Sequence, residues 1–126
     1  MTDNYKTGLL YLVHLLISSD GHVDETELYA LQQIKKRENI PDSLFNKFES
    51  SVKNKKEREI YEEGLKYLNL CTDEERLRAF IILYKMSEVD GWIHVKEVRL
   101  LLYSIKTAGI EFDDVVREAA EIPSFK

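Results

Sequence analysis

The sequence predicts an all-α protein of about seven helices, and three observations lead to this prediction. Only two prolines and five glycines interrupt 126 residues, of which 44% are hydrophobic and 33% charged, a composition typical of a helical globular chain. Two segments are apolar on nearly every side, and five more are apolar on one face. The sequence lacks Val/Thr-rich alternation and the Asn-Gly or Asp-Gly spacing of β-hairpins elsewhere, which leaves little room for a sheet.

The two central helices are predicted at residues 5–19 and 72–86. In the first, His14 is the polar residue inside a long apolar run, where we expect a core histidine with its hydrogen bonds satisfied. In the second, Thr72 and Glu75 have the spacing of a capping box, which begins a helix. A helix without a polar face is a buried one, so we expect the other helices to pack around this pair.

The five amphipathic helices are predicted at residues 24–38, 42–53, 57–70, 95–108 and 113–121. Their inward-facing residues are expected to be Leu28, Leu31, Ile34, Leu44, Phe45, Phe48, Ile60, Leu65, Leu68, Val98, Leu101, Leu102, Ile105, Val115 and Val116.

An internal repeat relates the two halves of the chain. It emerges when the sequence is laid over itself with a shift of 70 residues. The identical pairs are then Asp20/Asp90, Gly21/Gly91, Glu27/Glu97, Leu31/Leu101, Lys36/Lys106 and Ile40/Ile110. Asn39 and Gly109 also fall opposite each other, and both residue types tolerate the left-handed conformation that ends a helix. The sequence therefore predicts two helix-loop-helix units around the two central helices.

Length and charge limit the class of protein. The chain, residues 1–126, fits a single domain. Cys71 is the one cysteine, which excludes an internal disulfide and suits a reducing compartment, so we expect a cytoplasmic protein. No apolar run approaches the ~20 residues of a membrane span. The net charge of −5 argues against nucleic acid as the main partner, and we expect an unidentified protein partner, with the oligomeric state left open.

Each unit carries the pattern Asp-Gly-x-(Val/Ile)-x-x-x-Glu at the junction of its two helices. Divalent cations such as Ca²⁺ and Mg²⁺ prefer several oxygen ligands, and two acidic loops at one end of the fold would supply them. The second unit has an imidazole, that of His94, among the candidate ligands, and this favours Mn²⁺ or Zn²⁺ over Ca²⁺. The candidate metal ligands are Asp20, Asp24, Glu27, Asp90, His94 and Glu97.

The direction of the central helices decides whether this cation site exists. Parallel central helices would bring the two loops together, and antiparallel ones would separate them; the sequence leaves both open. A single EF-hand is excluded, because the seven residues from Asp20 to Glu27 are too few for its loop of about eleven.

Helix capping is the alternative explanation of the acidic residues. Asp24 and Glu27 have the spacing of a capping pair, which would satisfy free backbone amides without any metal. The protein would then be a structural module that binds partners on an exposed apolar or acidic face. No phosphate-binding loop, His-Glu-x-x-His or Gly-x-Ser-x-Gly pattern is present, so we expect a non-enzymatic protein, with a metal-dependent enzyme as the least favoured hypothesis.

The repeated acidic motif resembles that of the TerB-like family, the domain associated with tellurite resistance and found at the front of some membrane-anchored J-domain co-chaperones. The likeness covers about residues 7 to 118. It implies a compact all-α fold, cation binding by acidic residues of both motifs and a role in stress response. The family pattern falls on Asp20, Gly21, Glu27, Asp90, Gly91 and Glu97.

Overall fold

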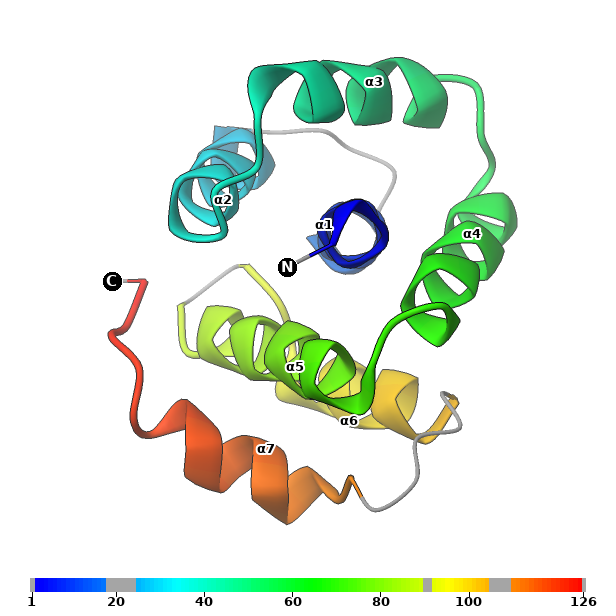
Figure 1. The fold of residues 1–126 in the computed structure, drawn as a ribbon. Helices are drawn as coiled ribbons and strands as arrows, with labels where there is room; N and C mark the ends of the chain where they lie inside the picture. Colours follow the sequence, from blue (N-terminus) through cyan, green and yellow to red (C-terminus); the bar gives the residue numbers. More distant parts are fainter. Residues whose placement is uncertain (1, 18–24, 90–91, 105–109, 126) are drawn as a thin grey trace.

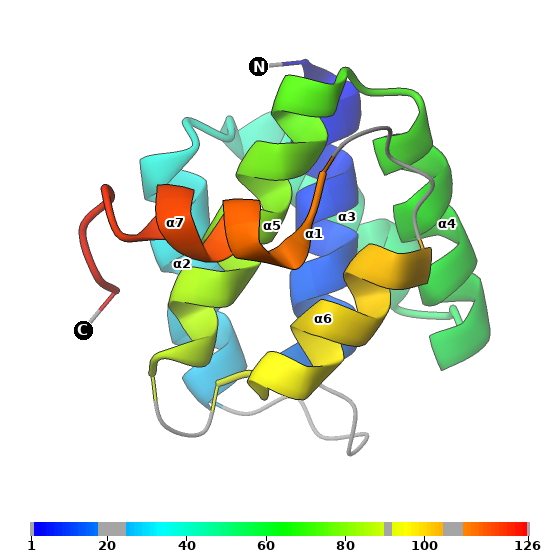
Figure 2. The same cartoon turned by 90° about the horizontal axis from the view of Figure 1, so that it is seen from below.

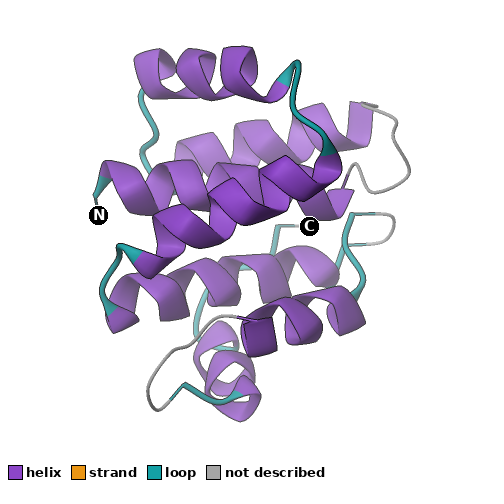
Figure 3. Ribbon diagram, turned by 90° about the vertical axis from the view of Figure 1, so that its right-hand side faces the viewer, coloured by secondary structure: helices purple, strands orange, loops and turns teal. Residues whose placement is uncertain are grey.

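The structure, a computed structural model, describes residues 2–17, 25–89, 92–104 and 110–125, and this part of the chain contains helices and no strand (Figure 3). The helices are α1 (Asp3–Ile17), α2 (Glu25–Arg37), α3 (Asp42–Val52), α4 (Glu57–Asn69), α5 (Asp73–Ser87), α6 (Val95–Ser104) and α7 (Phe112–Ala119). The predicted all-α class and seven helices are confirmed for the described residues. The bounds that fall on described residues lie within two residues of the predicted ones. The predicted end of α1 at residue 19, the start of α2 at 24 and the end of α6 at 108 lie outside the described residues.

Helix α1 occupies the centre of the molecule. Figure 1 looks along its axis and shows α2, α3, α4 and α5 around it. Residues 8–13 are all buried, and six consecutive residues exceed one helical turn of 3.6, so every side of the helix is covered. The all-round apolar sequence of this segment is therefore explained by packing on all sides.

Two glycines let α1 and α4 approach closely. A methyl group at Gly64 would lie 2.8 Å from Cδ2 of Leu12, and one at Gly8 would lie 3.0 Å from Cδ2 of Leu68. The order of these contacts shows that the two helices run antiparallel, because the earlier residue of α1 meets the later residue of α4. Because Gly8 and Gly64 have no side chain, the backbones of the two helices can lie close together.

Helices α1 and α5 run parallel. At their beginnings, the backbone N–H and the hydroxyl of Thr2 donate hydrogen bonds of 2.9 and 2.7 Å to Oε2 of Glu75. At the other end, the ring of Tyr29 from α2 lies 5.8 Å from the ring of Trp92, which precedes α6. Figure 2 shows the same direction for both helices, with α2 and α6 beginning at one common end. The two predicted helix-loop-helix units are thus α1 with α2 and α5 with α6.

A buried ionic cluster fixes the far end of α2 to both central helices. The Tyr5 hydroxyl donates a 2.5 Å hydrogen bond to Glu38, whose carboxylate also accepts hydrogen bonds of 3.2 and 3.0 Å from the Arg78 guanidinium. Burial first, and then the charge of Glu38, raises the pKa of Tyr5 well above its usual value. The tyrosine therefore stays a neutral donor at this junction of α1, α2 and α5.

Helix α2 ends as the sequence predicts. Asn39 adopts a left-handed conformation with φ of 54°. The N–H of Ile40 donates a 2.9 Å hydrogen bond to the carbonyl of Lys35, and the Ile40 side chain is buried. This is the Schellman arrangement that satisfies a free helix carbonyl. Its repeat partner Gly109 lies outside the described residues.

Most of the residues predicted to face inward are buried or pack against the core, but Leu28 is 48% exposed, so its prediction is wrong. The neighbouring Glu27 is turned inward instead, because its carboxylate bonds His14 in the interior. The apolar period therefore misplaces the buried face of α2 in its first turn only, since Leu31 and Ile34 are buried as predicted. Ile105 lies outside the described residues.

Replacing Gly64 by Val is expected to destabilise the protein by about 1–3 kcal/mol, because the added side chain overpacks the α1–α4 contact. Each kcal/mol corresponds to roughly 3–5 °C in Tm for a domain of this size. Thermal unfolding followed by circular dichroism measures the change. Asn46→Val on the exposed side of α3 is the control, and an unchanged Tm in Gly64→Val would contradict the close approach.

Replacing Glu75 by Gln is expected to cost about 1–3 kcal/mol at pH 7, because charge-assisted hydrogen bonds are lost. The backbone N–H of Thr2 is the main cause that lowers the pKa of Glu75 below its ordinary 4.5, with further hydrogen bonds from the side chain of Thr2 and from Thr72. A lowered folded pKa contributes stability above the unfolded pKa, and this stability is lost as the pH falls through the folded value.

The difference in unfolding free energy between wild type and Glu75→Gln should therefore shrink as the pH falls below 4.5. Urea unfolding at pH 7 and at steps down to pH 3 measures it. Glu74→Gln, at the exposed neighbouring position, should show no such pH-dependent difference. If the difference in unfolding free energy between wild type and Glu75→Gln stayed constant from pH 7 to pH 3, this would contradict the hydrogen bonds of Thr2 to Glu75 that join the beginnings of α1 and α5.

Candidate functional site

Three of the six predicted metal ligands are placed by the structure. Glu27, His94 and Glu97 are described, whereas Asp20, Asp24 and Asp90 lie outside the described residues. Within residues 2–17, 25–89, 92–104 and 110–125, no three His, Cys, Asp or Glu side chains come together in a way that could hold a metal ion. The three described candidates have different surroundings.

Glu27 is buried in the contact between α1 and α2. Its side chain is 1% exposed, and its Oε1 is hydrogen-bonded to Nδ1 of His14. The His14 ring also packs edge-on against Phe48 of α3, with ring centroids 6.0 Å apart. A buried carboxylate needs such a partner, because its desolvation is costly. His14 is thus a hydrogen-bonded interior histidine, as the sequence predicts.

His94 acts as the cap of α6. Its Nδ1 accepts a 3.3 Å hydrogen bond from the backbone N–H of Lys96, the second residue of that helix. A neutral imidazole that accepts at Nδ1 carries its hydrogen on Nε2. Binding of a metal at Nε2 would therefore require the other tautomer, which gives up the cap. The imidazole is exposed, so its ring is accessible from solvent.

Glu97 has a carboxylate that makes no hydrogen bond or ion pair with any other described residue. The repeat explains the difference from Glu27: a shift of 70 residues places Tyr84 opposite His14. Tyr84 packs edge-on against Phe112 of α7 instead, with centroids 5.9 Å apart. The second unit therefore lacks the histidine that binds the first glutamate, and Glu97 remains half-buried at the surface.

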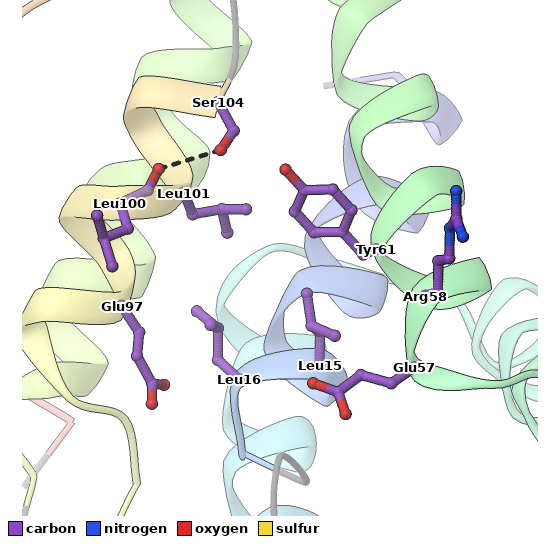
Figure 4. A pocket seen from close by; sticks show the side chains of 9 residues that line it. All are labelled: Leu15, Leu16, Glu57, Arg58, Tyr61, Glu97, Leu100, Leu101 and Ser104. Carbon is purple, nitrogen blue, oxygen red and sulfur yellow. Dashed lines mark hydrogen bonds between the residues drawn. The ribbon is translucent and has the colours of Figure 1, made fainter.

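The carboxylate of Glu97 lies at the edge of a groove of about 650 Å³ (Figure 4). We call this the α4–α6 groove. The end of α1 forms its floor, and α4 and α6 supply its walls (Figure 4). Its lining residues are Leu15, Leu16, Glu57, Arg58, Tyr61, Glu97, Leu100, Leu101 and Ser104.

Comparison of the chain with family models, curated proteins and solved structures gives no significant match. Its function therefore has to be inferred from its own residues. No described helix is both long enough and apolar enough to cross a membrane.

The α4–α6 groove was not predicted from the sequence, although one signal for it was present. Leu100 lies between the inward residues Val98 and Leu101 but is 66% exposed. A large apolar residue on the outward side of an amphipathic helix indicates a binding surface only where other apolar residues adjoin it, and the sequence alone does not identify those neighbours. The rest of the groove comes from helices far apart in sequence, and it is assembled only by the fold.

A basic pocket lies at the end of α2, and most of its cationic side chains are already bonded to other parts of the fold. It has a volume of about 360 Å³, and its cationic lining residues are Lys6, Arg37 and Arg78. Arg78 is paired with Glu38. Arg37 donates to the backbone carbonyls of Pro123 and Ser124 and lies 3.8 Å from the centroid of the Phe125 ring. Two of the three cations therefore hold the fold together.

Cys71 does not have the surroundings of a reactive thiol. It is 8% exposed, and its Sγ donates a 3.3 Å hydrogen bond to the carbonyl of Tyr67. Burial first, and then the charge of Glu75, raises the pKa of the Cys71 thiol. A raised pKa keeps the thiol protonated, whereas nucleophilic cysteines need the thiolate.

Replacing Glu27 by Gln is expected to destabilise the protein by about 1–3 kcal/mol in the presence of a chelator, because a buried hydrogen bond to His14 is weakened. Urea unfolding with EDTA present measures the loss. Glu25→Gln, at an exposed position in the same first turn, is the control. Equal stability of wild type and Glu27→Gln without metal would show that the carboxylate has no structural role.

Proposed function

We propose that the chain is a non-enzymatic, TerB-like helical module that binds a divalent cation through the paired acidic loops of its two units. The observation that carries the proposal is the parallel arrangement of α1 and α5. Thr2 bonds Glu75 at the beginnings of these helices, and Tyr29 meets Trp92 beyond their ends. This arrangement supplies the condition on which a shared site depends, since both units turn at the same end of the fold (Figure 2).

The carboxylate of Glu97, which has no partner among the described residues, supports the same proposal. Two carboxylates about 6 Å apart repel by roughly 3 kcal/mol at an effective dielectric of 20, and a divalent cation between them relieves this repulsion. The proposed ligands remain Asp20, Asp24, Glu27, Asp90, His94 and Glu97. Among Ca²⁺, Mg²⁺, Mn²⁺ and Zn²⁺, the presence of an imidazole favours the last two.

The proposed setting is the cytoplasm, and the proposed partner is a protein. Burial of Cys71 in its thiol form is compatible with a reducing compartment. The net charge of −5 favours cations or basic proteins over nucleic acid.

A protein-interaction module without a metal is the second candidate, and two contacts favour it. His94 caps α6, and Glu27 is bonded to His14. Both residues therefore have structural roles that need no ion. Stoichiometric cation binding distinguishes the two candidates.

Trp92 is the natural reporter for a cation at this end of the fold. It is the only tryptophan, it is buried, and its ring contacts Tyr29 and Phe125. After chelator treatment, titration with each of the four ions should give a saturable change in Trp92 emission. A ligand at 100 times its Kd adds about 2.7 kcal/mol of stability, so Tm should rise in parallel.

The double variant Asp90→Asn with Glu97→Gln should lose both responses. The control variant Asp113→Asn with Glu118→Gln also removes one aspartate and one glutamate charge, from exposed positions of α7. This control should retain both the change in Trp92 emission and the rise in Tm. An unchanged affinity in the first double variant would exclude these residues as ligands. Absence of any response to all four ions in the wild type would favour the interaction module.

A further inference from the structure

The α4–α6 groove presents an apolar surface that no described side chain fills. Leu15 and Leu16 of α1 lie at its floor, and Tyr61 and Leu101 face it from opposite walls (Figure 4). Leu100 on the α6 wall is 66% exposed. The volume of about 650 Å³ lies within the range of about 300–1,000 Å³ found for binding pockets. An exposed leucine beside a groove of this size with an apolar floor indicates a binding surface.

One end of this groove carries negative charge that no described cationic side chain compensates. Glu57 on α4 and Glu97 on α6 lie on its two sides, next to the floor leucines (Figure 4). Neither carboxylate makes an ion pair or hydrogen bond with another described residue. Arg58 is the one basic residue among the described lining residues. It points away from the groove in Figure 4, and its Nε lies 3.1 Å from Oε1 of Glu62.

We propose that the α4–α6 groove binds an amphipathic helix of a partner protein, and that a lysine or arginine of this helix lies between Glu57 and Glu97. An amphipathic helix places apolar side chains at positions i, i+3 or i+4 and i+7 into a groove of this kind. The leucines of α1 and α6 are the apolar complement of such a stripe. The two carboxylates select a basic residue next to it, because neither has a cationic partner among the described residues.

This inference goes beyond the proposed cation site and does not depend on it, although Glu97 belongs to both sites. Glu57 lies on α4 and is outside the six candidate ligands. A chelator removes divalent ions from the binding experiment, so the two functions are measured separately.

A displayed library of helical peptides tests the proposal. Each peptide has 18 residues. Positions i, i+3 or i+4 and i+7 of its helix carry either an apolar or a polar residue, and the positions beside this stripe carry Lys, Gln or Glu. Selection on the full chain in EDTA should enrich peptides with apolar residues at helical spacing and a flanking Lys. Leu100→Asn should weaken binding of the selected peptide by about tenfold or more, as expected for loss of a central apolar contact. Leu70→Asn, at a leucine that is 64% exposed on another surface, should not.

Charge reversal tests the basic residue. Glu57→Lys should weaken binding of the Lys peptide by about tenfold, and binding should be restored when the flanking Lys of the peptide is changed to Glu. Glu49→Lys, at an exposed position of α3, should leave both peptides unaffected. Glu57→Lys should also leave the response of Trp92 to divalent ions intact, so failure of the cation proposal and failure of this one give different results.

Three results would overturn the proposal. The first is that no selected peptide binds the wild-type chain more tightly than it binds the Leu100→Asn variant. The second is selection of peptides whose flanking positions are neutral or acidic. The third is concentration-dependent dimerisation in analytical ultracentrifugation that Leu100→Asn abolishes, which would make a second copy of the chain the occupant of the groove.

Discussion

Burial of α1 on every side is the constraint on which the arrangement of the other helices depends. A helix with six consecutive buried residues cannot lie at the edge of a bundle. It needs neighbours all around, and α2, α3, α4 and α5 provide them (Figure 1). The closest of these contacts, with α4, requires glycine at two positions. Because α4 can lie this near, its first turn stands beside the end of α1 and forms one wall of the α4–α6 groove.

The parallel direction of the two central helices gives the molecule two unlike ends. At the end where α1 and α5 begin, polar side chains are tied into hydrogen bonds among Thr2, Glu75, Tyr5, Glu38 and Arg78. At the other end, Glu57 and Glu97 have carboxylates without partners among the described residues. The acidic residues of the two ends therefore differ. Glu38 and Glu75 are hydrogen-bonded at the first end. At the other end Glu27 is bonded to His14, whereas Glu57 and Glu97 are available to a ligand.

The sequence predicts the features of this fold that depend on local chemistry. Thr72 begins α5 with a capping box, and Asn39 ends α2 with a positive φ, because caps and helix ends are decided by a few neighbouring residues. The position of Leu28 was mispredicted, since a pattern of apolar residues contains no information on a buried Glu27 held by His14.

Features that depend on packing between distant parts of the chain could not be predicted from the sequence. The direction of α5 relative to α1 depends on contacts such as Thr2 with Glu75, which are 73 residues apart. The α4–α6 groove likewise combines Leu16, Glu57 and Leu100 from three helices. The repeat predicts that Glu27 and Glu97 are equivalent, but one packing difference, His14 against Tyr84, gives them different surroundings.

The central position of α1 has a consequence for the order of folding. Its contacts with α2 are local, with His14 and Glu27 only 13 residues apart, whereas Thr2 and Glu75 are separated by 73. Closing the longer loop costs about 1.5 kcal/mol more in chain entropy, so α1 and α2 are expected to pair first. In a chain synthesised from its N-terminus, the remaining apolar sides of α1 stay uncovered until α4 and α5 have emerged. Exposed apolar surface of this kind promotes aggregation of folding intermediates, so we expect the chain to be most prone to aggregation before α4 and α5 have emerged.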